Sequence, residues 1–286
     1  MQSAPTATLV TPSYRYDFER CELLVESIGH CAPTLKHVIL VDKPDLPQFR
    51  SLQSNTTTIV DTRAVLDRSY IRLPGSSGWW IGLRTPPIRG WLTQQLRKLA
   101  IGRIVDTDII INIDSDVAFI RHFGVEDFID DAGRLSLFSV DYRNEEILKW
   151  SSLSRRILET DTDQTPMNHV GMMICWWRNQ LENMLDAMER ANGVPWQTLL
   201  GRQMTFSEYE LYGTYILDKI GLDASRHFPD SRKLIETSWG WDLAAEGALA
   251  RFVGDVPSDA IGLMVHSKDG IAASAYRALL AHHWRN

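Results

Sequence analysis

The alternation of short β-branched runs with a helical pattern constrains the fold of this chain more than any other feature. Residues 7–11, 37–42 and 57–61 are candidate strands, and residues 16–28 form an amphipathic helical pattern between the first two. This order is typical of βαβ units, whose neighbouring strands run parallel. The sequence therefore predicts an α/β fold, with a mixed and mostly parallel sheet flanked by helices.

Polar residues follow each of these three runs. Thr11-Pro12-Ser13 ends the first run, Asp42 the second and Asp61 the third. Ligands of open α/β sheets bind at the carboxyl ends of the strands. We therefore expect a nucleotide at this edge of the sheet.

The most specific local pattern is an aspartate pair behind a buried strand. A helical pattern at residues 88–105 precedes the apolar run 109–113, which leads directly into Asp114-Ser115-Asp116. Two carboxylates delivered to a sheet edge can share one cation, and hard oxygen ligands suit Mg²⁺ or Mn²⁺. Such a cation would in turn neutralise a diphosphate.

The rest of the chain completes one domain without an evident linker or repeat. Residues 68–90 are rich in Gly, Pro, Ser and Arg and predict a long loop or lid that closes over a ligand. Further strands are expected at residues 135–140 and 170–175, and further helices at 145–158, 179–191 and 206–220.

Composition excludes several classes of protein. A net charge of −6 gives no general field for nucleic acid or an anionic membrane. The sequence contains no candidate membrane-spanning run or secretory signal, so we expect a cytoplasmic protein. Its 3 cysteines lack metal-site spacing and are expected to be core thiols. The 10 tryptophans are numerous, and some of them could face a sugar.

Several motifs occur in the order found in GT-A glycosyltransferases, which the chain resembles. These are VTPSY, the stretch QQLRKLAIGRIVDTDIIINIDSDVAFI, FSEYELYG and VHSK. The resemblance implies a Rossmann-like GT-A domain over residues 1–286, with a donor half at 1–116 and an acceptor half at 117–286. It further implies a hexosyltransferase-like enzyme of bacterial glycan or glycoconjugate synthesis, using a nucleotide sugar, most simply a UDP-sugar, and a hydroxyl acceptor.

The same resemblance implies roles for individual residues. It makes Asp114, Asp116 and His266 the metal ligands and Glu208 the candidate base. Donor-binding residues would be Thr11, Pro12, Ser13, Tyr14, Asp42, Gln95, Lys98, Asp114, Ser115 and Lys268. The sequence has Glu208-Tyr209-Glu210 where the family has adjacent acidic residues, so Glu210 stays an alternative base. Helical geometry separates these two side chains and suggests that Glu210 is solvated.

Three other functions remain open on the sequence. A haloacid-dehalogenase-type phosphohydrolase also uses a strand followed by DxD, although that motif belongs to its first strand. A nucleotidyltransferase uses metal carboxylates, but VTPSYRYDF lacks the glycine-rich loop expected after the first strand. A carbohydrate-binding protein without catalysis would explain the tryptophans alone. Neither the acceptor, the stereochemical outcome nor the oligomeric state follows from the sequence.

Overall fold

A five-stranded central sheet organises the molecule. The structure is a computed structural model that describes residues 4–73 and 79–285. The strand order in the central sheet is β10-β7-β1-β2-β3. These strands are β1 (Ala7–Pro12), β2 (Lys36–Val41), β3 (Thr57–Asp61), β7 (Ile109–Ile113) and β10 (Met173–Trp177).

Most of this sheet is parallel. Strand β1 pairs in parallel with both β2 and β7, and β2 pairs in parallel with β3. Only β10, at one edge, runs antiparallel to its neighbour β7. The predicted mixed, mostly parallel sheet is therefore confirmed.

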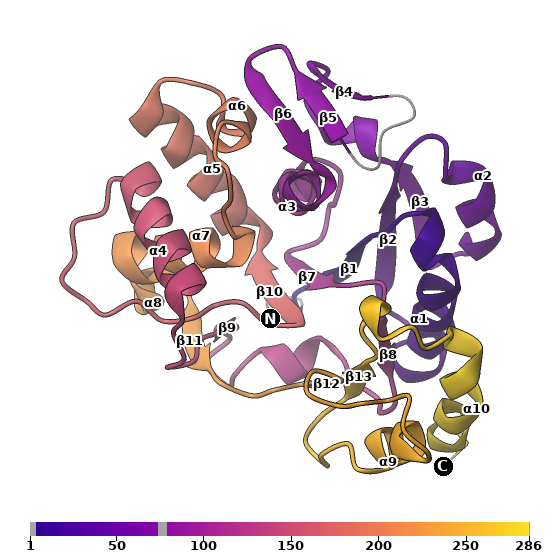
Figure 1. Cartoon of the computed structure of the whole chain (residues 1–286). Helices are drawn as coiled ribbons and strands as arrows, with labels where there is room; N and C mark the ends of the chain where they lie inside the picture. Colours follow the sequence, from indigo (N-terminus) through magenta and orange to yellow (C-terminus); the bar gives the residue numbers. More distant parts are fainter. Residues whose placement is uncertain (1–3, 74–78, 286) are drawn as a thin grey trace.

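Helices cover both faces of the sheet (Figure 1). Successive strand residues point to opposite faces, so Val10 and Ile110 belong to one core cluster while Leu9 and Ile111 belong to another. The first cluster includes residues of α3 (Gly90–Ala100), α5 (Arg178–Asn192) and α7 (Glu208–Thr214), and the second includes α1 (Phe18–Cys31). This two-sided burial explains why these strands are apolar throughout.

Short sheets and helices complete the fold. Strands β8 (Val117–Phe119), β12 (Ile235–Thr237) and β13 (Gly262–Met264) form one small sheet, and β9 (Leu135–Phe138) pairs with β11 (His227–Asp230). The remaining α-helices are α2 (Leu46–Phe49), α4 (Glu145–Leu158), α6 (Trp196–Gly201), α8 (Leu222–Ser225), α9 (Ala248–Gly254) and α10 (Ala273–His283). A π-helix, η6 (Tyr215–Ile220), continues α7. Single 3-10 turns are η1 (Arg15–Asp17), η2 (Arg50–Leu52), η3 (Thr62–Ala64), η4 (Ile101–Arg103), η5 (Val125–Phe128) and η7 (Ser267–Asp269).

Local signals place helix α4 where the sequence predicts it. The helix spans Glu145–Leu158, and the side chain of Asn144 accepts a hydrogen bond from the backbone N–H of Ile147 at 2.9 Å. This cap satisfies one of the amide groups that every helix start leaves without a partner.

The prediction of a long loop at residues 68–90 is wrong for the described part of that segment. Strands β4 (Tyr70–Arg72), β5 (Trp79–Gly82) and β6 (Thr85–Arg89) form an antiparallel sheet. Pro86 and Pro87 argue against a strand in the sequence, so β6 was not predicted. Prolines are tolerated in β6 because it is an edge strand. Residues 74–78 of the expected lid lie outside the described residues, and closure over a ligand stays a prediction.

Two expectations drawn from composition can be compared with the structure. All three cysteines are buried and free, which confirms their assignment as core thiols. In residues 4–73 and 79–285, no helix is both long and apolar enough to cross a membrane.

Candidate functional site

The strand order creates a switch point between β1 and β7. From β1 the chain proceeds to β2 and β3 on one side, whereas β7 lies on the other side. The segments that follow β1 and β7 therefore diverge at the carboxyl edge, where open α/β sheets bind ligands. Tyr14 and Asp17 follow β1, and Asp114 and Asp116 follow β7.

Three carboxyl groups come close together at this switch point. Burial, together with the negative charges of Asp114 and Asp17, raises the pKa of Asp116 to about 7 against the opposing effect of backbone hydrogen bonds. One of these bonds comes from the N–H of Ser267 at 3.3 Å. Burial also raises the pKa of Asp17, with Asp114 adding to the effect while Arg20 and His266 oppose it. The three carboxyl groups thus lie close enough for their charges to repel one another.

His266 and Lys268 reach the same edge from the other end of the chain. The backbone of Asp116 accepts a hydrogen bond from Val265, which directly precedes the half-buried His266. The N–H of His266 donates to the Ser238 hydroxyl at 3.0 Å. Lys268 is exposed on η7. Contacts between β8 and β13 therefore bring the predicted third metal ligand to the predicted aspartate pair.

The carboxylate oxygens of Asp114 and Asp116 suit a hard divalent cation whose other ligands are water or phosphate. In the described part of the chain, no three His, Cys, Asp or Glu side chains form a ready-made metal cage. Mg²⁺ characteristically needs only one or two carboxylates, with waters and substrate phosphates as its other ligands. The mutual repulsion that raises the pKa of Asp116 is what a bound cation would relieve. The residues therefore fit a cation shared with a phosphate ligand.

Lys98 connects this acidic edge to α7. Its Nζ lies 3.0 Å from Asp114 Oδ1, 2.8 Å from the Tyr209 hydroxyl and 3.2 Å from Glu208 Oε1. Burial lowers the pKa of Lys98, but the charges of Asp114 and Glu208 and the hydrogen bond to Tyr209 outweigh burial and raise it well above its usual value. The ammonium group therefore stays charged and fixes one oxygen of Asp114.

Glu208 and Gln95 are both buried at the contact between α3 and α7. The Gln95 side-chain oxygen accepts a hydrogen bond from the N–H of Glu208 at 2.9 Å. Burial raises the pKa of Glu208, and the charge of Lys98 opposes this. Gln95 was predicted to bind the donor. In the structure its side-chain oxygen accepts a hydrogen bond from the first turn of α7.

The prediction that Glu210 is solvated is wrong. Its side chain is fully buried and accepts hydrogen bonds from the Ser151 hydroxyl at 2.7 Å and the His169 N–H at 2.6 Å. Helix α7 lies in the core, and all of its residues are buried. Two side chains that diverge on such a helix are therefore both buried.

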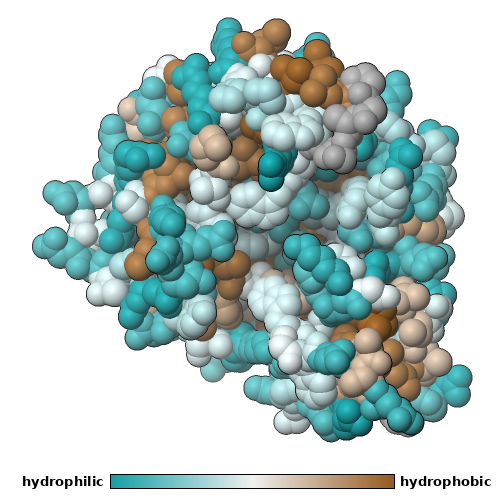
Figure 2. Space-filling model, viewed as in Figure 1, coloured by the Kyte–Doolittle hydropathy of each residue, from teal (hydrophilic) through white to brown (hydrophobic). Residues whose placement is uncertain are grey.

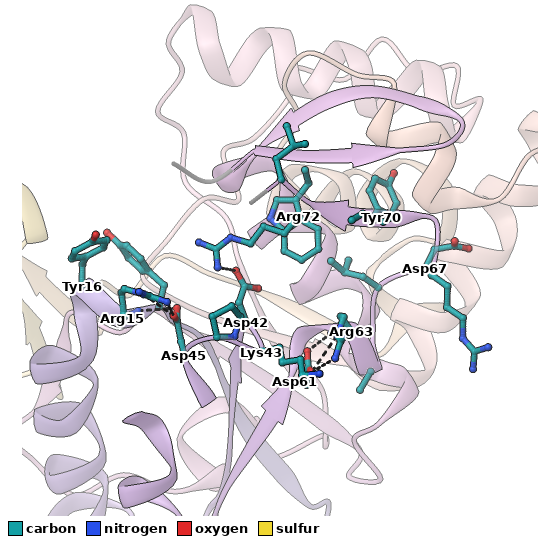
Figure 3. A pocket seen from close by; sticks show the side chains of 18 residues that line it. Arg15, Tyr16, Asp42, Lys43, Asp45, Asp61, Arg63, Asp67, Tyr70 and Arg72 are labelled. Carbon is teal, nitrogen blue, oxygen red and sulfur yellow. Dashed lines mark hydrogen bonds and ion pairs between the residues drawn. The ribbon is translucent and has the colours of Figure 1, made fainter. Parts of the chain in front are cut away.

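A large open cavity adjoins the carboxyl ends of β1, β2 and β3 (Figure 3). It encloses about 1140 Å³ and is bounded on its other side by residues of β4 and β5. Tyr14 and Asp42, both predicted to bind the donor, line it. Asp42 is held by ion pairs with Arg97 at 2.7 Å and Arg72 at 3.0 Å.

The other predicted residues near the nucleotide edge lie in the interior. Thr11, Pro12, Ser13 and Ser115 are buried, and none of them lines the cavity. The Thr11 hydroxyl is 2.9 Å from His37 Nε2, an interaction that joins β1 to β2. Side chains at the end of a buried strand alternate in direction, so only part of TPSY reaches the cavity.

Five cationic residues that line the cavity were not predicted from the sequence: Arg15, Lys43, Arg63, Arg68 and Arg72. Arg15 and Lys43 directly follow the predicted residues Tyr14 and Asp42, whereas Arg72 belongs to the segment interpreted as a loop. The positions of Arg15 and Lys43 after predicted strands were a usable signal. Arg72 was not accessible from sequence because its pairing with Asp42 depends on how the β4–β6 sheet packs.

The tryptophans are divided between the core and the surface. Trp176 is fully buried and Trp80 nearly so, although Trp80 also lines the cavity. Trp239 is 61% exposed, and its ring centroid lies 6.5 Å from that of His266. His169 is buried, with Nδ1 2.8 Å from the Phe138 carbonyl, which favours a structural role.

Fold and site together define a mixed α/β protein with an open cavity and a carboxylate cluster at one sheet edge. The sequence matches DUF6492, a family of unknown function, over residues 6–238, and the chain belongs to this family. No curated protein matches the sequence.

Two solved structures of LgtC are similar to this chain. The galactosyltransferase LgtC in complex with donor and acceptor sugar analogues is 10% identical, with a TM-score of 0.48. An active-site mutant of LgtC is 11% identical, also with a TM-score of 0.48. Each comparison covers 96% of this chain and 95% of the other. These values are too low to assign residue roles or a substrate.

Proposed function

We propose that this chain is a metal-dependent glycosyltransferase of the GT-A type, which transfers a sugar from a nucleoside-diphosphate sugar to a hydroxyl acceptor. The observation that carries the proposal is the cluster of mutually repelling carboxyl groups of Asp17, Asp114 and Asp116 beside the cavity. A diphosphate brought in with a divalent cation matches this charge pattern, whereas a bare anion would be repelled.

The cation would be Mn²⁺ or Mg²⁺, held by Asp114 and Asp116 with His266 as a further ligand. When bound, it would supply positive charge that stabilises the departing diphosphate. Lys268, exposed on the adjoining turn, would neutralise a phosphate oxygen. Asp17 is a carboxylate that the sequence motif does not include, and its charge adds to the attraction for the cation.

The nucleoside would bind in the cavity next to this cluster. Tyr14 is 40% exposed there and offers a flat ring, while Arg15, Lys43 and Arg72 supply donors. Asp42 orients Arg72 through their ion pair. We propose a UDP-sugar as donor, since the cavity is large enough for a nucleoside and its aromatic and polar lining suits a base and a ribose.

The Lys98–Glu208 pair would act at the transferred sugar. Lys98 holds Asp114 in place and is itself held by Glu208. If the reaction inverts configuration, Glu208 is the candidate base for the acceptor hydroxyl. If configuration is retained, Glu208 orients the sugar through Lys98. The acceptor would approach beside Trp239, whose exposed ring suits stacking on a sugar.

Calorimetry tests the proposal directly. We expect UDP to bind at least about tenfold more tightly with Mn²⁺ than with the metal chelated, because the cation screens the carboxylates. Asp116→Asn should abolish this difference. Asp106→Asn is the matched control, since Asp106 is an exposed aspartate before the amino end of β7. Equal affinity with and without Mn²⁺ would exclude the proposed donor site.

A turnover measurement tests the role of Glu208. Glu208→Gln should lower turnover by about 10² to 10⁴-fold with donor affinity nearly unchanged, if it is a base. Phosphate release from simple phosphate esters without any acceptor would instead favour a phosphohydrolase.

A further inference from the structure

The outer face of the β4–β6 sheet departs from the usual pattern of an antiparallel sheet. Its inner face is ordinary, because Tyr70, Trp80 and Ile88 are buried in the main core cluster. The opposite face of such a sheet is normally polar where it meets water. Here Ile71 and Ile81 are direct cross-strand partners and both are exposed, Ile71 by 62%.

The β5–β6 turn extends this apolar surface. Leu83 stands in the turn and is 85% exposed. Arg202 donates a hydrogen bond to the Arg84 carbonyl at 3.2 Å, which brings the segment after α6 beside the turn. Met204, in that segment, is 95% exposed. We call Ile71, Ile81, Leu83 and Met204 the apolar tip.

Figure 2 shows brown surface at the top of the molecule, in the region that Figure 1 assigns to the β4–β6 sheet. Exposed large apolar residues that gather in one place mark an interaction surface more often than a chance exposure. The small β4–β6 sheet therefore carries a surface suited to a partner.

Positive charge surrounds the apolar tip, although the whole chain carries a net charge of −6. Residues 63–89 contain 5 arginines and a single acidic residue, Asp67. Arg63 and Arg72 are paired with Asp61 and Asp42, so the charge near the tip comes from the other arginines. Arg68, Arg84, Arg89 and Arg202 are exposed, and the Arg89 guanidinium lies 5.4 Å from the Trp79 ring centroid. Arginine, tryptophan and exposed aliphatic side chains together are characteristic of surfaces that bind at a membrane interface.

We propose that the apolar tip and its arginines dock the protein on an anionic lipid surface. Leu83 and Met204 would enter the boundary between headgroups and acyl chains, while Arg84 and Arg202 contact lipid phosphates. Ile71 also lines the large cavity, so a docked membrane lies beside the mouth of that cavity. The inference does not depend on the transferase activity proposed above.

Vesicle sedimentation of the full chain without nucleotide or metal tests this inference. The protein should bind vesicles of phosphatidylcholine containing phosphatidylglycerol, and bind pure phosphatidylcholine vesicles much more weakly. Raising the salt concentration should weaken the binding, since exposed charges are screened. Absence of binding to both kinds of vesicle would overturn the inference.

Matched variants separate the tip from the rest of the surface. Leu83→Asp should lower the vesicle partition coefficient about tenfold or more, because it removes an inserted side chain and adds negative charge. Arg84→Glu should weaken binding to anionic vesicles about tenfold. Leu148→Asp is the control, since Leu148 is an exposed leucine on α4. Equal binding by wild type and Leu83→Asp would contradict the proposal.

Size-exclusion chromatography tests whether a second copy of the chain, instead of a lipid surface, covers the apolar tip. A dimer that Leu83→Asp converts to a monomer would mean that a second copy of the chain covers the tip, and would overturn the lipid proposal. Nucleotide binding by Leu83→Asp should equal that of the wild type, so failure of this inference and failure of the proposed function give different results.

Discussion

Asp116 and Glu210 are two buried carboxyl groups whose neighbours act in different ways. The pKa of each is raised to about 7, with burial as the largest cause. At Asp116, the negative charges of Asp114 and Asp17 add to burial. At Glu210, hydrogen bonds from the His169 N–H and the Ser151 hydroxyl oppose it, and no exposed surface remains. One carboxyl group is strained by neighbouring charge, and the other is accommodated by neutral donors.

This difference separates a ligand site from an architectural contact. The energy stored by repulsion at Asp116 is released when a cation arrives, so the strain favours binding. Glu210 has no comparable unmet interaction, because both of its oxygens already accept hydrogen bonds. A perturbed pKa alone therefore does not identify a functional residue, and the neighbours that cause it must be compared.

The largest effect should come from Asp116→Ala, which tests the ligand side of this comparison. We expect transfer to fall by at least roughly 10² to 10³-fold, because the cation that stabilises the leaving group loses a ligand. Cooperative unfolding should remain, since a strained carboxylate adds little to stability. Activity assays with thermal denaturation of the same samples check both statements. A variant that stays active would show that Asp116 holds no essential ligand.

Lys98→Met should have the next largest effect, on stability as well as activity. It leaves Glu208 buried without its cation, and breaking a buried pair costs roughly 3 to 5 kcal/mol. Chemical denaturation should show this loss, and the double variant with Glu208→Gln should recover part of it. Lys149→Met is the control, because Lys149 forms only an exposed pair with Glu145. A fully stable single variant would mean that Lys98 and Glu208 are not coupled.

Glu210→Gln should change how stability depends on pH. A raised pKa means that the folded state holds the proton more tightly, so the stabilising contribution is full below about pH 4.5 and declines until about pH 7. The variant stays neutral, so its stability relative to wild type should improve between pH 5 and pH 8 by on the order of 3 kcal/mol. Unfolding curves at both pH values measure this. An unchanged difference would show that Glu210 is already ionised at low pH.

Trp239→Ala should have the smallest effect, and it tests how far the ligand site extends from the acidic edge. Loss of one stacking ring should raise the KM for a sugar acceptor by about tenfold and leave UDP affinity unchanged. Trp91→Ala is a control because Trp91 is another exposed tryptophan, at the start of α3. An unchanged acceptor KM would place the acceptor away from Trp239.

Periodicity was sufficient to predict most of the fold. Strand β3 and helix α4 have the bounds expected from sequence, because the first is a short β-branched run and the second has a helical pattern. The β4–β6 sheet was missed because its strands are short and β6 contains two prolines, so no period is established. Its stability comes from the burial of Tyr70, Trp80 and Ile88 against the main core.

The sequence by itself determined which polar residues follow the apolar runs of the central strands. These are TPSY, Asp42 and Asp114-Ser115-Asp116. The carboxyl ends of parallel strands must meet at one edge, so these residues had to lie near each other. Only the tertiary structure decided which of them face the cavity, that Asp17 joins the aspartate pair, and that Glu210 is buried. The physical reason is that side-chain direction and burial depend on what packs against each element, and those partners are distant in sequence. Ser151 on α4 and His169 before β10 donate hydrogen bonds to Glu210. The sequence of α7 contains no local pattern that predicts these two partners.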